Sequence, residues 1–436
     1  MTQARRAAWK ALVALEKGDA ARLVLDRRRL TPADRDFALE LARGTERLHL
    51  FLDFALRATV CERLPADPHL RCALRLGAYQ ILLLGGVPDY AAVHETVSLV
   101  RDRRSFLNGA LRNLARAVLT RPADPTLPRV ELPLDAARTL LLSRGSLPDP
   151  ETDPGGFVAA RYGLPRFLVQ GWFESFGSDV MAAAAASCRT PAVVLRPTLH
   201  AGGGAPQLAA ELRAEGVETV PAARPDLLRW SGGASPFAGR SFAAGAFVVQ
   251  DATAYEAAFA VGAVPGEAVL DACAAPGTKA TLLAEHVGTT GAVYAYDADR
   301  RRRRLITGNA QRLRLDGVLR VCEAIDDVPA GVDRVLVDAP CSNTGVLARR
   351  VEVRRKLTPE TAAVMATTQA ELLRDALERV RVGGTVVYAT CSIERVENQG
   401  VVAELVGDGV TLLREHTTLP RGDRDGGYHA VLQRRR

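Results

Sequence analysis

The feature that most constrains the fold is a series of nearly continuous apolar segments in the second half of the chain. From about residue 241 the candidate strands read AFVVQD, AVLDACA, GAVYAYD, DRVLVDAP and GGTVVYATCS. Helix-like stretches such as RRRRLITGNAQRLRL and ETAAVMATTQAELLRDALERV lie between them. Strands without polar alternation are typical of a parallel sheet that is covered on both faces. Strands that alternate with helices therefore predict an α/β domain over residues 241–436.

The first part of the chain has a different pattern. Over residues 1–122, apolar residues recur every three or four positions, as in RAAWKALVALEKG and HLRCALRLGAYQILLLG, which predicts a helical bundle. Thr31-Pro32 and Pro88-Asp89 mark helix starts. Because 436 residues are too many for one ordinary core, we predict a multidomain protein. Residues 123–240 then form a proline-rich linker and a small α/β module between the two larger domains.

Composition limits the setting and the partners. The formal net charge of +7 fits a polyanionic partner such as nucleic acid without requiring one. The seven cysteines include no CxxC pair, so we expect neither a disulfide framework nor a metal site, and a reducing cytoplasm is the natural location. The longest apolar run is too short to span a bilayer, so we expect no membrane association. A monomer is the default expectation.

The first candidate site is the segment VLDACAAPGTKA. A buried strand enters a loop of small residues, and the helix that follows offers free amide donors at its N-terminus. Asp297 ends the next strand, twenty residues after Gly277, where an acid typically binds the ribose hydroxyls of a nucleotide-like cofactor. The absence of GxGxxG disfavours NAD and FAD. The alternative is an ordinary strand, turn and helix with a surface acid.

Two further candidate sites follow other buried strands. Asp338 ends one strand and Cys341 lies in the next turn, after a proline, while Cys391 lies just past another strand end. Since open α/β folds bind ligands at the carboxyl edge of the sheet, we expect these side chains at one edge. A free cysteine is usually a small buried hydrophobe. That interpretation is kept for the remaining cysteines outside the cofactor loop, which are Cys61, Cys72, Cys188 and Cys322.

These motifs carry a family resemblance. DACAAPGTK, DAPCS, TGV and YATCS with Glu397-Asn398 resemble the motifs of the Sun/Nop2 family of RNA (cytosine-5)-methyltransferases, over roughly residues 157–436. The helical part resembles a NusB-like RNA-binding domain through DRDFALELARGTER, LRLGAYQILLL, AVHETV and FLNGALR. The combination is similar to the bacterial 16S rRNA methyltransferase B type. It implies a Rossmann-like domain that uses S-adenosylmethionine to methylate carbon 5 of a cytosine in RNA, with small-subunit ribosomal RNA as the expected substrate.

The chemistry explains why such residues are wanted. Carbon 5 of cytosine is a poor nucleophile until a thiolate adds to carbon 6, and a base must later remove the carbon 5 proton so that the thiol can leave. The residues alone leave open which cysteine attacks, because DNA cytosine-5 enzymes use the cysteine after a proline, here Cys341. The resemblance implies Cys391 as nucleophile, Cys341 assisting release, Asp338 on the base and Lys279 near the methionine end of the cofactor and the catalytic pocket.

The resemblance also implies two sets of binding residues. Those around the cofactor are Cys273, Ala274, Ala275, Pro276, Gly277, Thr278, Lys279, Asp297, Glu323 and Asp338. Those expected to contact RNA on the helical domain are Arg71, Arg75, Arg112 and Arg116. The basic run Arg300–Arg304 is equally compatible with a solvated helix face and with RNA contact.

The chain departs from the family pattern at several points. Thr278 replaces the second glycine of CAAPGGK, Glu323 stands for an aspartate at the third cofactor acid, and Glu352 takes the acid position of RRHPD. DGFF is replaced by DGGYHAVL. Thr278 and Glu323 motivate a rival interpretation, an RNA-binding protein with a decayed methyltransferase domain. Two further rivals are an exocyclic-amine methyltransferase, which would have no use for Cys391, and a methyltransferase that acts on transfer RNA.

Overall fold

The computed structural model describes residues 3–26, 28, 30–407 and 409–436. Contacts within the chain group it into two compact units. Unit 1 comprises Met1–Thr190 and Leu347–Leu357, and unit 2 comprises Pro191–Val346 and Thr358–Arg436. The predicted module at 123–240 therefore contributes residues to both units. In the described part of the chain no helix is both long and apolar enough to cross a membrane.

Unit 1 begins with the predicted helical bundle. Thr31 caps the second helix by accepting a hydrogen bond from the amide of Asp34, with Pro32 at the first helical position. The periodic apolar pattern continues from this helix into the next one, but the helix ends at Leu48, where the backbone leaves helical geometry. The apolar faces of the helices share one core, to which Leu12, Leu52 and Leu74 contribute. The helices are α1 (Gln3–Lys17), α2 (Pro32–Arg47), α3 (His49–Thr59), α4 (Pro68–Leu82), α5 (Asp89–Val97) and α6 (Arg104–Ala117).

The rest of unit 1 comes from two separate parts of the chain. A small antiparallel sheet has the order β1 (Val118–Leu119), β3 (Thr139–Leu141) and β2 (Glu131–Pro133). Three helices follow, α7 (Pro154–Tyr162), α8 (Arg166–Phe176) and α9 (Val180–Cys188). The chain returns to this unit much later through the 3-10 helix η5 (Val351–Arg355).

Unit 2 opens with a four-stranded antiparallel sheet in the order β5 (Val217–Pro221), β6 (Leu228–Gly233), β4 (Val194–Pro197) and β7 (Phe247–Val249). The helices α10 (Gly204–Ala214) and α11 (Arg240–Ala243) belong to the same part of the chain. The segment AFVVQD, predicted as the first strand of the large α/β sheet, forms β7 instead. That prediction was wrong because β7 pairs antiparallel with β4, and strand pairing depends on distant residues.

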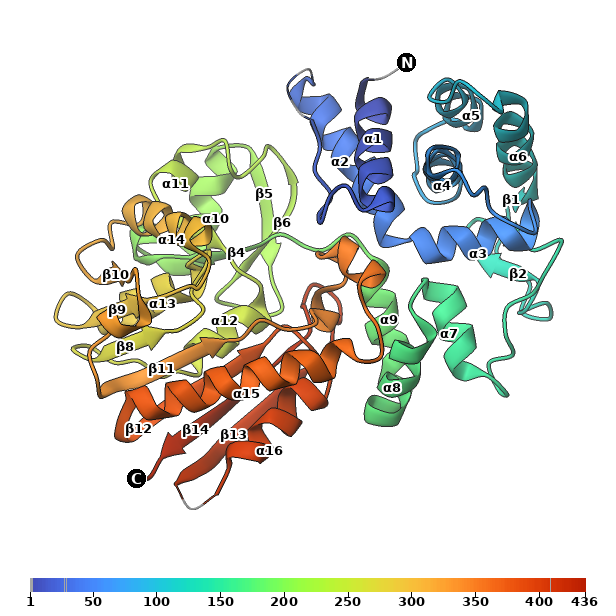
Figure 1. Ribbon diagram of the computed structural model, residues 1–436. Helices are drawn as coiled ribbons and strands as arrows, with labels where there is room; N and C mark the ends of the chain where they lie inside the picture. The colour runs from blue at the N-terminus through green and yellow to red at the C-terminus, as the bar shows by residue number, and fades with distance from the viewer. Residues whose placement is uncertain (1–2, 27, 29, 408) are drawn as a thin grey trace. The chain divides into compact units, whose positions relative to one another are not determined.

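The large sheet confirms the predicted Rossmann-like fold (Figure 1). Its order is β10-β9-β8-β11-β12-β14-β13. The first five strands in this order are parallel to one another. The strand β14 pairs antiparallel with β12 on one side and with β13 on the other. The strands are β8 (Ala268–Asp271), β9 (Ala292–Ala295), β10 (Leu319–Val321), β11 (Val332–Asp338), β12 (Val380–Thr390), β13 (Val410–Thr418) and β14 (Gly427–Arg434).

Helices cover both faces of this sheet, which explains its continuous apolar strands. Along β11, Leu336 packs into a core with residues of α13 and α14, whereas Val335 and Val337 pack into a core with residues of α15 and α16. The helices of this part are α12 (Ala252–Phe259), α13 (Thr278–Val287), α14 (Arg300–Arg312), α15 (Thr361–Arg379) and α16 (Val401–Leu405). A π-helical turn, η6 (Val396–Gly400), immediately precedes α16.

Candidate active site

The carboxyl ends of three neighbouring strands assemble the site in unit 2. The strands β8, β11 and β12 lie side by side in parallel, and Asp338 at the end of β11 is in register with Ala389 near the end of β12. Cys341 and Cys391 follow these ends in the chain. The sequence prediction that Asp338 and both cysteines share one edge of the sheet agrees with this topology.

The two cysteines are in direct contact. The Sγ atoms of Cys341 and Cys391 are 3.3 Å apart. The pKa of the Cys341 thiol is raised well above its usual value, first by the hydrogen bond with Cys391 and then by burial. Cys341 is therefore a protonated thiol at neutral pH. Asn343 completes the group, because its Oδ1 lies 3.4 Å from the Sγ of Cys391 and its Nδ2 donates to the Cys341 carbonyl at 2.5 Å.

A buried carboxylate links the loops that carry the cysteines. Each cysteine precedes a serine, and the hydroxyls of Ser342 and Ser392 both donate to Oε2 of Glu397, which is 0% exposed. The other oxygen, Oε1, accepts from the Ser342 amide at 2.8 Å and from Gln369 at 3.0 Å. A carboxylate with four donors is stable without a cationic partner. The serine of each motif thus holds its neighbouring cysteine in place.

Beside the thiols lies a partly buried ion pair. Lys279 Nζ is 2.6 Å from Oδ2 of Asp338. Burial lowers the pKa of Lys279, but the carboxylate of Asp338 raises it more, so the net shift is upward and the ammonium stays charged. Both residues line a small cavity of about 50 Å³ that Cys391, Asp251 and Asp425 also border. The thiol of Cys391 and the ion pair of Lys279 and Asp338 therefore line the same cavity.

The loop after β8 has the backbone of a ligand cradle. Gly277, at the N-cap of α13, has a φ of +102°, and a Cβ there would lie 3.2 Å from Ile306. The buried Asp297 holds the loop from the end of the neighbouring strand, because its carboxylate accepts from the amides of Ala275 at 3.1 Å and Asp299 at 3.0 Å. Backbone and acid are thus positioned as a nucleotide-like cofactor requires.

A second acid under this loop was not anticipated from the sequence. Asp271 ends β8 and is 0% exposed, and neither carboxylate oxygen has a hydrogen-bond donor at bonding geometry among the described residues. Burial, followed by the nearby carboxylate of Asp338, raises its pKa to about 7. The acids Asp271 and Asp338 beside the loop favour a cationic ligand, which fits S-adenosylmethionine, whose sulfonium and α-ammonium are both cationic. The residues present therefore fit the cofactor that the sequence predicted.

Part of the basic run Arg300–Arg304 turns toward this loop. Arg302 donates to the Ala275 carbonyl at 2.6 Å and lies 3.3 Å from the carboxylate of Asp297. Arg303 forms an ion pair with Glu323 at 3.1 Å, and the Glu323 side chain is 72% exposed. Arg302 therefore braces the cofactor loop, whereas Arg303 holds Glu323 after the neighbouring strand.

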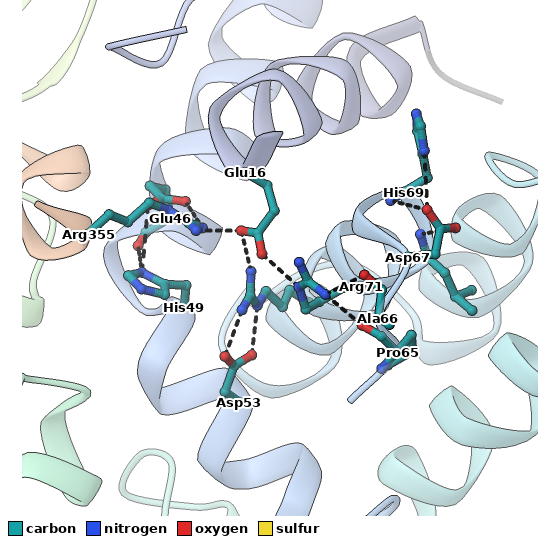
Figure 2. Close-up of polar contacts among 12 residues, drawn as sticks. Glu16, Glu46, His49, Asp53, Pro65, Ala66, Asp67, His69, Arg71 and Arg355 are labelled. Carbon is teal, nitrogen blue, oxygen red and sulfur yellow. Dashed lines mark hydrogen bonds and ion pairs between the residues drawn. The ribbon is translucent and has the colours of Figure 1, made fainter. Parts of the chain in front are cut away.

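In unit 1, the arginines expected to bind RNA divide into two groups. Arg71 pairs with Glu16 at 2.6 Å, and Arg75 pairs with Glu16 and with both oxygens of Asp53 at 2.7 Å each. Figure 2 shows Arg71, Glu16 and Asp53 within one ion-pair network. Arg75 is 6% exposed, so its guanidinium is occupied internally. By contrast, the exposed arginines on α6 donate to asparagines of the same helix, and they are Arg112 and Arg116.

The same network includes an arginine from the returning segment of unit 1. Arg355 donates two hydrogen bonds to Glu46, one of them at 2.8 Å, and it also donates to Glu16 (Figure 2). Glu46 is 0% exposed, and burial raises its pKa despite this partner. The preceding Arg354 is 3% exposed and donates to the carbonyls of Arg47 and Ser187. The segment Leu347–Leu357 is therefore an internal part of unit 1.

A larger cavity in unit 1 carries mostly positive charge. It measures about 870 Å³ and lies between α1, the start of α4 and the loop before α6. Trp9 and His69 form one aromatic wall, with ring centroids 5.7 Å apart. The acids on its rim are Asp67 and Asp102, and its basic side chains are Arg6, Lys10, Arg101, Arg103 and Arg104.

The roles of several of these residues could not be found from the sequence. Asp251, Asp271 and Asp425 lie in segments that the sequence patterns single out, and Asn343 directly follows DAPCS, but none of them could be given a role from the sequence, because their roles depend on which loops meet in space. Glu397 was noted only as part of a motif. The pairing of a serine with each cysteine was the available signal for it, because two identical Cys-Ser steps at one sheet edge suggest a shared partner.

Comparison with known proteins assigns both units. The family model described as "16S rRNA methyltransferase RsmB/F" matches residues 258–422, and the NusB family model matches residues 2–116. The ribosomal RNA small subunit methyltransferase B of Thermus thermophilus is 30% identical over 448 residues, covering 99% of this chain and 97% of that protein. The protein of the same name from Pseudomonas syringae is 30% identical over 421 residues, covering 91% of this chain and 85% of that one.

Solved structures share the fold. The crystal structure of PH0851 superposes with a TM-score of 0.74 at 20% identity, covering 98% of this chain and 99% of that one. The structure of NSun6 from Pyrococcus horikoshii with SFG gives a TM-score of 0.56 at 18% identity, covering 62% and 98%. Together with the relatives that match along nearly the whole chain, this places the chain in the 16S rRNA methyltransferase RsmB/F family, as an S-adenosylmethionine-dependent RNA methyltransferase with an N-terminal NusB domain.

Proposed function

We propose that the protein methylates carbon 5 of a cytosine in 16S ribosomal RNA through a covalent adduct with Cys391. The observation that carries this proposal is the pair of thiols, 3.3 Å apart, beside the ion pair of Lys279 and Asp338. An exocyclic-amine methyltransferase has no use for two thiols at that place. A decayed enzyme would not be expected to keep the supporting bonds of Glu397 intact.

The residues divide the reaction between them. The thiolate of Cys391 forms a bond to carbon 6 of the cytosine, and the electron pair of the 5,6 double bond moves toward carbon 5. Asp338 and Lys279 stabilise the ring as charge develops at nitrogen 3. When bound, S-adenosylmethionine supplies the electrophilic methyl group that carbon 5 attacks.

Release requires a second group. The proton on carbon 5 is taken by Cys341 acting as a base once it is ionised, the electron pair of that C–H bond restores the 5,6 double bond, and the bond from carbon 6 to Cys391 breaks. In the resting site the raised pKa of Cys341 keeps it protonated, so the thiol must first transfer its proton to solvent water before it can accept the proton from carbon 5. The target base has to be unpaired or flipped to reach these thiols.

The test compares single cysteine variants with S-adenosylmethionine and unmodified small-subunit RNA. Wild type forms 5-methylcytosine, detected by mass spectrometry, and Cys391→Ala forms none. Cys341→Ala accumulates RNA–protein adduct on a denaturing gel. Cys61→Ala, a matched change in unit 1, behaves as wild type. Product from Cys391→Ala would refute the role of this cysteine, and wild type that binds RNA but forms no 5-methylcytosine would favour the decayed-enzyme alternative.

We further propose that the basic cavity of unit 1 contacts the RNA backbone. Arg71 and Arg75 direct their charge to internal acids, whereas Arg6, Lys10 and Arg103 are exposed at the cavity. Lysine and arginine at an open surface neutralise phosphates and release counterions, which gives sequence-independent affinity. Trp9 and His69 add aromatic surface in the same place. Arg112 and Arg116 stay candidates as an additional contact.

A further inference from the structure

Asn343 occupies an unusual backbone position between the two thiols. Its φ is +62°, in the left-handed region, where asparagine is the best tolerated residue after glycine. It lies two residues after Cys341, and its side-chain nitrogen Nδ2 donates back to the backbone carbonyl of Cys341 at 2.5 Å. This bond fixes which end of the amide faces the other thiol.

The fixed orientation presents an acceptor to Cys391. With the amide nitrogen engaged by the Cys341 carbonyl, Oδ1 faces the Sγ of Cys391 at 3.4 Å and accepts its S–H. A reversed amide would bring two oxygens to 2.5 Å, which is repulsive. Because the Cys391 S–H is directed to Asn343, the thiol of Cys341 is the donor in the 3.3 Å contact between the two sulfurs. The three groups form a directed chain from Cys341 through Cys391 to Asn343.

The two hydrogen bonds of this series act on the protonation of Cys391 in opposite directions. An oxygen acceptor stabilises the thiol form and repels a thiolate, whereas a donor on the sulfur stabilises the thiolate. Cys391 also stays aimed along a single direction, because its S–H points at the Asn343 oxygen. We propose that Asn343 is a positioning residue that aligns Cys391 and keeps it as a thiol until substrate enters.

The proposal rests on the proposed function only for naming Cys391 as the nucleophile, so its test uses the RNA-free protein. Asn343→Gly retains the left-handed backbone and removes both the acceptor and the bond to the Cys341 carbonyl. Asn343→Asp tolerates the same backbone and adds a negative charge, but it also loses the donor to that carbonyl, which repels its carboxylate. The rate of iodoacetamide alkylation at Cys391 is measured against pH by mass spectrometry of its peptide, which separates it from Cys341.

The expected result is an ordered series. At neutral pH the alkylation of Cys391 becomes faster in Asn343→Gly and slower in Asn343→Asp, with wild type between them. Asn113→Asp adds the same charge on α6 in unit 1 and leaves the profile of Cys391 unchanged. The pH profile of methylation shifts in the same direction as that of alkylation.

Other outcomes overturn the proposal. If all three proteins titrate alike, or if the glycine and aspartate variants shift in the same direction, Asn343 acts only through loop structure. Circular dichroism and the thermal midpoint of each variant establish that the comparison is made between folded proteins. Loss of methylation with an intact ordered series would leave this proposal standing and count against the proposed reaction instead.

Discussion

At the scale of single residues, Asp271 makes a prediction about pH. Its pKa of about 7 in the folded protein compares with an ordinary 3.8. Between about pH 4 and pH 7 the folded chain keeps a proton that the unfolded chain has lost, so this residue lowers the free energy of unfolding as pH rises. At pH 7 the cost reaches at most about 4 kcal/mol. In Asp271→Asn the free energy of unfolding should therefore decline less between about pH 4 and pH 7, as measured by urea unfolding across this pH range.

A control of opposite sign is available in the same sheet. The pKa of Asp333 is lowered, first by its hydrogen bond from Arg381, so the stability that Asp333 contributes is gained as the pH rises to about 4 and stays constant above it. Asp333→Asn should therefore lower the free energy of unfolding by a constant amount between about pH 4 and pH 7 and leave its slope with pH unchanged, whereas Asp271→Asn flattens that slope. An unchanged slope in Asp271→Asn would contradict the assignment of the raised pKa to this carboxyl.

The sequence predicted these residues unevenly, for a physical reason. Asp338, Cys341 and Cys391 follow buried strands, and the carboxyl ends of parallel strands meet at one edge, so position in the sequence was sufficient. For Arg75, position in the sequence did not predict the role of the side chain, because its ion-pair partners, Asp53 and Glu16, lie 22 and 59 positions away in sequence. A basic side chain looks the same in sequence whether it faces phosphate or a buried acid.

At the scale of elements, the turn into α13 carries the next prediction. Gly277→Ala forces a side chain into φ +102° and to 3.2 Å from Ile306, so we expect a loss of about 1–3 kcal/mol in the free energy of unfolding. Affinity for S-adenosylmethionine, measured by calorimetry, should fall as well because the loop amides move.

The other end of the same helix supplies the matched control. Gly288 also has positive φ, at +64°, but a Cβ there meets nothing within 4 Å. Gly288→Ala should also lose stability, because its backbone (φ +64°, ψ −170°) lies in a region that is essentially restricted to glycine, but it should keep its affinity for the cofactor. If both variants bind S-adenosylmethionine equally well, the close approach at Gly277 has no part in the cradle.

Element types followed from the sequence more readily than element partners. Continuous apolar strands predicted a sheet covered on both faces, and two cores now flank it. The same pattern could not assign β7 to the small sheet, since an isolated apolar run has no signal for its neighbour. Nor did periodicity reveal the break at Leu48, because the apolar spacing continues across it from α2 into α3.

At the scale of the whole molecule, the proposed RNA surface should control salt dependence. Combined reversal of Lys10 and Arg103 to glutamate should weaken RNA binding. It should also reduce the slope of log affinity against log salt by roughly 0.7–0.9 for each phosphate that the surface no longer neutralises. Filter binding at several salt concentrations measures both quantities.

Reversal of Arg112 and Arg116 is the matched comparison, because both are exposed on α6 of the same unit. If only that pair changes the slope, the RNA path follows α6 and the cavity does not bind RNA. If neither pair changes it, unit 1 neutralises no phosphates through these residues.

The return of the chain to unit 1 at Leu347–Leu357 limits how this protein can be divided. A gene cut after Thr190 would leave Glu46 buried without the guanidinium of Arg355, and a buried charge that loses its partner costs several kcal/mol. The C-terminal fragment would keep Arg354 and Arg355, whose hydrogen-bond partners Arg47, Ser187 and Glu46 lie in the part of unit 1 that has been removed. Recombination that exchanges NusB domains between such enzymes must therefore carry this strip along, so the two units are constrained to evolve together.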